Sequence, residues 1–98
     1  MRSRSSGSAA STPSGKVRLF RLAAEQGDPD AQNNLGGMYA EGLGVERDPV
    51  EAYMWLGLAA AQGHELAQRN LEFVVPSLEP EQVAEADERI RAWRTAHP

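Results

Sequence analysis

The stretch that decides the fold is LAAEQGDPDAQNNL at residues 22–35, which recurs as LAAAQGHELAQRNL at residues 58–71. At this offset of 36 residues, nine of the fourteen aligned positions are identical. Chance would give about one identity in such a window, so the chain contains an internal duplication, the signature of a repeat architecture. A period of 36 residues is close to the length of one pair of helices joined by a turn.

Helix start and stop signals recur with the duplication. Asp28 and Asp48 are each followed by a proline, which suits an N-cap residue and the first position of a helix. Gly27 and Gly63 follow apolar helical patterns and end them. Together with the spacing of the apolar residues, these signals predict five helices, over residues 16–26, 29–41, 49–62, 65–75 and 80–96.

The expected fold class is all-α, a short α/α solenoid of antiparallel helix hairpins with a C-terminal capping helix. Residues 1–15 are rich in serine and should form a disordered tail, although their arginines and lack of acids also resemble a transit peptide. The remaining domain, residues 16–98, is expected to comprise a trailing half-repeat (16–27), a complete repeat (28–63), a leading half-repeat (64–76) and the capping helix (77–98).

Composition narrows the possible functions. The 98 residues suffice for one small domain, and the absence of cysteine excludes disulfides, thiol nucleophiles and zinc sites built on thiolates. With only two histidines, we expect no enzymatic activity, no metal and no cofactor. No apolar run approaches the roughly 20 residues of a membrane span, and no secretory signal is visible. The expectation is therefore no membrane partner and, by default, a cytoplasmic location.

Charge is divided unevenly along the chain, whose net charge is −4. Residues 1–24 contain five Lys or Arg and no acid, whereas residues 25–98 contain all 14 acids and only five arginines. A basic N-terminal segment could bind an anionic partner weakly. The acidic remainder would repel such a partner and no nucleic-acid motif is present, so we expect no nucleic-acid binding.

The repeat resembles the Sel-one-like repeat (SLR) family, relatives of tetratricopeptide repeats. The resemblance covers about residues 28–63 and implies an antiparallel α-hairpin solenoid that acts as an adaptor or scaffold in a protein complex, with no catalytic residues. The residues that carry it are Ala31-Gln32-Asn33-Asn34-Leu35-Gly36, Met38-Tyr39, Gly42-Leu43-Gly44-Val45, Asp48, Ala52, Trp55, Leu56, Ala59-Ala60 and Gly63.

Polar residues at repeated positions are the candidate partner-binding site. In related solenoids the first helix of each hairpin lines the concave surface, and here those helices carry Gln32, Asn33, Gln68 and Arg69. Asn34 and Asn70 occupy the same position of the repeat. The alternative for all six is an internal role, in which their side chains bond neighbouring loops.

The leading functional hypothesis is a non-enzymatic module that binds a peptide or protein surface along its groove. The alternative is a fragment of a longer array, or a unit that self-associates, because the first helix should lack its hairpin partner. Its apolar edge, Val17, Leu19 and Phe20, would then mediate homo-oligomerisation.

Other residues that suggest chemistry have simpler interpretations. Gly42-Leu43-Gly44 lacks the lysine of a phosphate-binding loop and indicates a turn between helices. His64 lies at the repeat position of the cap Asp28, so capping is favoured over an acid–base pair with Glu65. Glycines inside helices are expected where a neighbouring backbone or an aromatic ring needs the space, with Tyr39, Tyr53 and Trp55 filling it; these glycines are Gly36, Gly37 and Gly57.

Overall fold

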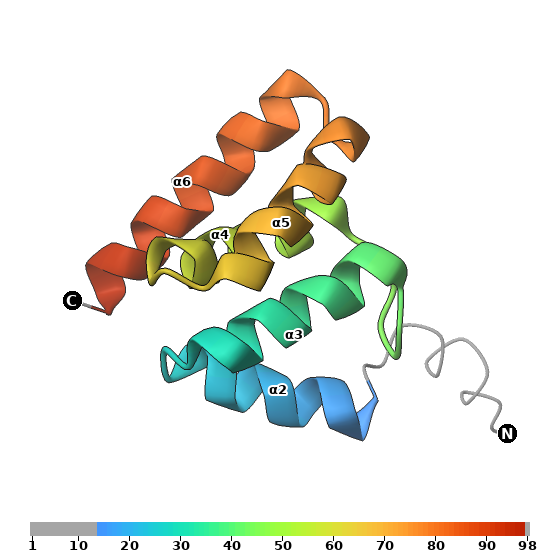
Figure 1. Ribbon diagram of the computed structural model, residues 1–98, viewed down its shortest axis with the longest axis vertical. Coiled ribbons are helices and arrows are strands. Elements are labelled where there is room, and N and C mark those ends of the chain that lie inside the picture. The colour runs from blue at the N-terminus through green and yellow to red at the C-terminus, as the bar shows by residue number, and fades with distance from the viewer. Residues whose placement is uncertain (1–13, 98) are drawn as a thin grey trace, which may run out of the picture.

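The computed structural model describes residues 14–97, which fold as a helical array without strands (Figure 1). This confirms the all-α helical-repeat prediction. The elements in chain order are α2 (Gly15–Glu25), α3 (Pro29–Glu41), α4 (Pro49–Ala61), α5 (Glu65–Val74), the 3₁₀ turn η1 (Val75–Ser77) and α6 (Pro80–Ala96).

The first helix begins earlier than predicted. Ser14 is its N-cap, accepting a hydrogen bond from the backbone N–H of Val17, and the helix starts at Gly15. Ser14 also donates its own N–H to the carbonyl of Gly44 at 2.8 Å, which ties the helix to the α3–α4 loop. Ser14 and Gly15 therefore belong to the helical domain, and residues 1–13 of the predicted tail lie outside the described residues.

Side chains before each later helix satisfy its free N–H groups. Asp28 caps α3 and Asp48 caps α4, in each case with a proline at the first helical position. His64 caps α5 through Nδ1, which accepts from Ala67 N at 3.2 Å. At α6, Glu79 and Gln82 form a capping box, in which the backbone N–H of Glu79 donates to Gln82 Oε1 at 2.8 Å. Sequence spacing located all four starts correctly.

Helix α4 is the centre of the fold. It packs against α3 as an antiparallel hairpin, and α5 and α6 cover its other sides, while α2 packs on α3 (Figure 1). A helix covered all round must be apolar all round, and this accounts for its composition. Its buried residues are Val50, Ala52, Met54, Trp55, Leu56, Leu58 and Ala59.

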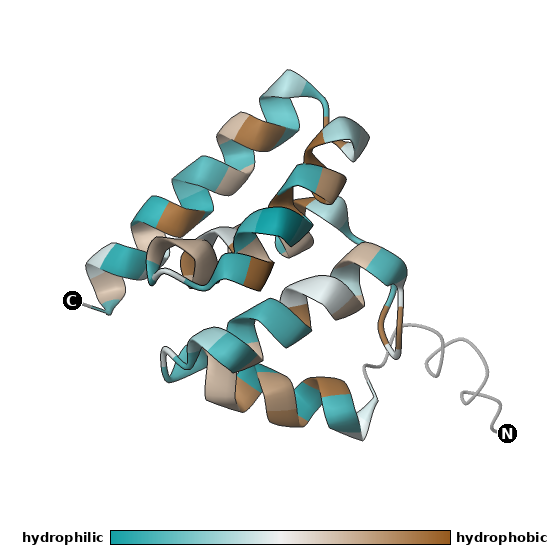
Figure 2. Ribbon diagram, viewed as in Figure 1, coloured by the Kyte–Doolittle hydropathy of each residue, from teal (hydrophilic) through white to brown (hydrophobic). Residues whose placement is uncertain are grey.

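The peripheral helices bury only one face. In α2 only Val17 and Ala24 are buried, and in α5 only Ala67 and Val74. Apolar and hydrophilic positions alternate along both helices accordingly (Figure 2). Part of their apolar surface therefore remains exposed.

Of Gly36, Gly37 and Gly57, two allow close helix packing, but the contacts are aliphatic instead of aromatic. A Cβ at Gly36 would lie 2.6 Å from Leu56 Cγ, and one at Gly57 would lie 2.7 Å from Ile90 Cδ1. Gly37 has nothing within 4 Å of its Cβ position. The expectation that Tyr39, Tyr53 and Trp55 fill this space is wrong, because Leu56, with its backbone nitrogen 3.1 Å from the Cβ position of Gly36, and Ile90 occupy it.

None of the helices within residues 14–97 combines the length and apolar character that crossing a bilayer requires.

Candidate functional site

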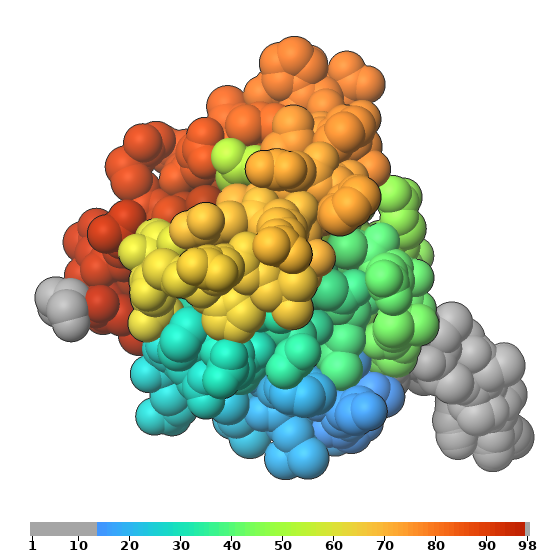
Figure 3. Space-filling model, viewed as in Figure 1, coloured from blue at the N-terminus to red at the C-terminus, as the bar shows by residue number. Residues whose placement is uncertain are grey.

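A groove runs along the face where α3 and α5 lie side by side (Figure 3). It comprises two adjoining hollows of about 450 and 370 Å³, which share Gly37, Glu41 and Asn70. We call it the α3–α5 groove. Its other lining residues are Lys16, Phe20, Asn33, Asn34, Met38, Ala40, Leu43, Arg47, Pro49, Leu56, Leu66, Phe73, Val74 and Ser77.

Large apolar side chains stand exposed along this groove. Phe73 of α5 is 80% exposed and Leu66, two helical turns earlier, is 51% exposed. Leu43, in the α3–α4 loop, is 56% exposed. Contiguous exposed apolar groups beside a concave surface are typical of protein-binding sites.

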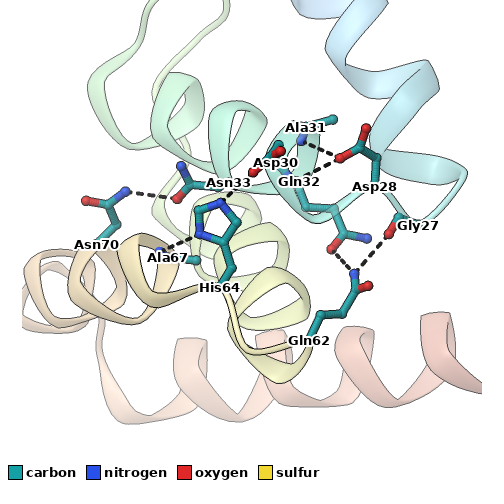
Figure 4. A network of polar contacts seen from close by, with 10 residues as sticks. All are labelled: Gly27, Asp28, Asp30, Ala31, Gln32, Asn33, Gln62, His64, Ala67 and Asn70. Carbon is teal, nitrogen blue, oxygen red and sulfur yellow. Dashed lines mark hydrogen bonds and ion pairs between the residues drawn. The ribbon is translucent and has the colours of Figure 1, made fainter.

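An amide pair joins the two walls of the groove (Figure 4). Asn70 of α5 donates from Nδ2 to Oδ1 of Asn33 on α3, at 3.0 Å. Asn33 is only 7% exposed, and a buried amide of this kind must find a partner. The bond therefore sets how closely α5 lies against α3.

A second amide pair joins the hairpin turns (Figure 4). Gln62 donates from Nε2 to Gln32 Oε1 at 3.0 Å and to the carbonyl of Gly27 at 2.9 Å. Gln32 in turn donates to the carbonyl of Ala24 at 3.1 Å and has no exposed surface. Its polar groups are satisfied inside the fold, so Gln32 is not accessible to a partner.

The other three predicted binding residues are dispersed. Asn33 lines the groove, but its Oδ1 is bonded to Asn70. Gln68 and Arg69 are exposed on α5, and neither lines the groove; Gln68 Nε2 lies 3.4 Å from the carbonyl of Ala60. The groove instead presents Leu66 and Phe73, neither of which was predicted from the sequence as a binding residue. The available signal was their spacing. Leu66 and Phe73 lie seven residues apart, on one face of α5, whereas the buried residues Ala67 and Val74 lie on a different face.

The predicted self-association edge is also rearranged. Val17 has no exposed surface and belongs to the core, because its side chain packs beside Gly44 in the α3–α4 loop. Leu19 is 69% exposed, and Phe20 is partly buried. Both line a third hollow, of about 430 Å³, between α2 and α3.

His64 has a structural role at the turn between α4 and α5. Nδ1 caps α5 and Nε2 lies 2.9 Å from Asp30 Oδ1, so the ring joins α5 to α3 (Figure 4). Both ring nitrogens are therefore engaged. Gly42 and Gly44 both have φ of +73°, which fits the interpretation of their segment as a turn.

Of the cations of the N-terminal segment, the structure describes Lys16, Arg18 and Arg21. Arg2 and Arg4 lie outside the described residues. Arg21 donates to the hydroxyl of Tyr39 and lies over its ring, with Cζ 5.6 Å from the centroid. Of the described cations in this segment, Lys16 and Arg18 are exposed.

Two tyrosines have a raised pKa. For Tyr39 the main cause is burial; the Arg21 guanidinium opposes it and the carboxylates of Glu51 and Asp48 add to it. For Tyr53, burial and then the neighbouring Asp87 carboxylate raise the pKa above its usual value of 10.0. Both shifts favour the neutral phenol and indicate packing.

Comparison with known proteins agrees with this architecture. Residues 17–28 and 29–64 match the family model of the Sel1 repeat. A sel1-like repeat-containing protein of Acanthamoeba polyphaga mimivirus is 48% identical over 55 residues, which cover 56% of this chain and 10% of that protein. DAP3-binding cell death enhancer 1 of Rattus norvegicus is 44% identical over 55 residues, covering 56% of this chain and 11% of that protein. The chain spans about a tenth of the length of these relatives. With a repeat of 36 residues, antiparallel helix hairpins and this family match, the chain is a Sel1-like repeat protein.

Proposed function

We propose that the α3–α5 groove binds a segment of a protein partner, without catalysis. Sel1 repeats mediate protein–protein interactions. One relative is named for binding DAP3, which favours a protein ligand. The observation that carries the proposal is the exposure of Phe73, 80%, beside the larger hollow of the groove.

The surroundings of Phe73 favour an amphipathic segment as the ligand. Leu66 and Leu43 extend the apolar surface along the groove, and Glu41 and Arg47 place opposite charges at its edge. Such a surface matches a helix or peptide with apolar anchors and flanking polar groups. Burial of an exposed aromatic anchor supplies most of the affinity in interfaces of this type.

Photo-crosslinking from position 73 in cells, followed by affinity measurement with the partner so identified, tests the proposal. Phe73→Ser should weaken that partner's binding by about tenfold or more. Leu22→Ser is the matched control, because Leu22 is 60% exposed on the outer side of α2 and does not line the groove. Both variants should retain the thermal unfolding midpoint of the original chain. Equal affinity for the two variants would contradict the proposal.

A further inference from the structure

The offset of 36 residues maps α2 onto α4, and α4 shows what that helix is built to contact. Leu56 of α4 packs against Gly36 of α3, and Ala52 and Ala59, four before and three after it, share its helix face. All three are completely buried. Their equivalents in α2 are Lys16, Phe20 and Ala23.

In α2 the same face is hollow. Lys16, Leu19, Phe20 and Ala23 line one side of the 430 Å³ hollow, and Ala31 and Asn34 of α3 lie on the other. Among residues 14–97, no helix packs on this face of α2 in the way that α3 packs on the equivalent face of α4. We call these four residues of α2 the α2 docking face.

The amide side chains that make the polar contacts of the repeat have equivalents beside this face as well. Asn34 is equivalent to Asn70, which donates to Asn33 of α3. Gln26 is equivalent to Gln62, which donates to Gln32, also of α3. Gln26 and Asn34 are both exposed. A helix placed on the α2 docking face as α3 is placed on α4 would thus meet two amide donors at the same relative positions.

We propose that the α2 docking face receives the first helix of a Sel1-type hairpin supplied by a separate polypeptide. This helix carries a glycine where it crosses Phe20, as Gly36 crosses Leu56, and amides that correspond to Gln32 and Asn33. A second copy of the described residues offers no such helix, because Gly36 of α3 already packs on Leu56 of α4, and α5 has Glu72 at the position equivalent to Gly36. The proposal is independent of the function of the α3–α5 groove, although the two surfaces share Lys16 and Phe20.

The charge of Lys16 further specifies the helix that would bind to the α2 docking face. Lys16 stands where α4 has Ala52. Because the paired helices are antiparallel and cross at Gly36 and Leu56, the residue of the occupant nearest Lys16 is the one equivalent to Ala40, one turn beyond its glycine. A carboxylate at that position would pair with the Lys16 ammonium, so the favoured helix has an acidic residue there.

A synthetic peptide with the sequence of residues 28–44 of this chain tests the proposal, titrated into the isotope-labelled protein and followed by NMR. We expect saturable shifts at Phe20, Ala23 and Asn34. Leu19→Asp should weaken binding about tenfold or more, whereas Leu22→Asp, at the other exposed leucine of α2, should leave it unchanged. Absence of binding, or equal loss in both variants, would overturn the proposal.

Peptide variants make the register testable. The Gly36→Ala and Gly37→Ala variants of the peptide have the same composition. Only Gly36→Ala should lose affinity for the protein, by about tenfold or more relative to Gly37→Ala. The Ala40→Glu substitution in the peptide should strengthen its binding to the original protein. The same substitution should weaken its binding to the Lys16→Glu variant of the protein. Equal affinities within either pair would refute this docking geometry.

Two further measurements distinguish this proposal from peptide binding in the α3–α5 groove and from occupation of the α2 docking face by a second copy of the chain. Phe73→Ser should bind the peptide with unchanged affinity, and a loss there would place binding in the α3–α5 groove instead. Sedimentation equilibrium of the protein alone should show a monomer at the concentrations of the titration. A dimer that Leu19→Asp dissociates would overturn the proposal in favour of a second copy.

Discussion

Gly36 of α3 lies so close to Leu56 of α4 that a Cβ at position 36 would be 2.6 Å from Leu56 Cγ and 3.1 Å from its backbone nitrogen. The branch point and main chain of Leu56 cannot move aside as the end of a flexible side chain could. The closest approach within the central hairpin therefore depends on one glycine, and the neighbouring Gly37 has open space at its Cβ position.

Substitution of these two glycines by alanine should have opposite effects. Gly36→Ala is expected to lower the free energy of unfolding by about 1–3 kcal/mol through overpacking. Gly37→Ala should raise it by roughly 0.5–1 kcal/mol, since alanine is the better helix former. Urea denaturation followed by circular dichroism measures both. If Gly36→Ala were as stable as Gly37→Ala, the close packing of α3 on α4 would be wrong.

Gln62→Ala should destabilise the fold although Gln62 is itself exposed. It removes the donor to Gln32 Oε1, which has no exposed surface, and the donor to the carbonyl of Gly27. An unsatisfied buried acceptor costs about 1–3 kcal/mol. Gln68→Ala is the control, because the acceptor of Gln68, the carbonyl of Ala60, lies 3.4 Å away at an exposed site. Equal unfolding midpoints for the two variants would rule out a structural role for the Gln32–Gln62 pair.

Glu51→Ala should loosen the attachment of α6. Glu51 accepts from Trp55 Nε1 at 3.2 Å and from Arg89 Nη1 at 2.8 Å, so it joins two residues of α4 to α6. We expect a loss of about 1 kcal/mol and faster amide exchange in α6 than in α3. Glu88→Ala should change neither, because Glu88 is 72% exposed and 3.9 Å from Arg91. Exchange accelerated equally in α3 and α6 would contradict a local role for Glu51.

Alkaline pH should destabilise the protein through Tyr53. Burial and the Asp87 carboxylate raise the pKa of Tyr53 in the folded state, so its contribution to stability is complete below the usual value of 10.0 and is lost as pH rises through the folded pKa. Tyr53→Phe should reduce the alkaline slope of the unfolding free energy, and Tyr39, whose pKa is also raised, should account for the rest. Urea denaturation on either side of pH 10.0 provides the measurement. An unchanged slope in Tyr53→Phe would contradict the assignment.

The helix starts and the repeat were predictable because their signals are local. Asp28-Pro29 and Asp48-Pro49 act within one turn, and the duplication is visible by alignment alone. The exposed residues of α5 were harder to identify. Leu66 and Phe73 have the side chains of core residues, and only the position of α5 over α4 shows that Ala67 and Val74 are the residues buried there.

The sequence by itself determined an all-α repeat of 36 residues with its helix caps, since periodicity, capping and chain reversal depend on residues close together along the chain. Only the tertiary structure decided that Gln32 and Val17 are buried and that Phe73 and Leu19 are exposed. Burial depends on which helices come together, and that is settled by packing between residues far apart along the chain, such as Gly36 with Leu56 and Asn33 with Asn70. The same packing leaves the α3–α5 groove and the α2 docking face open.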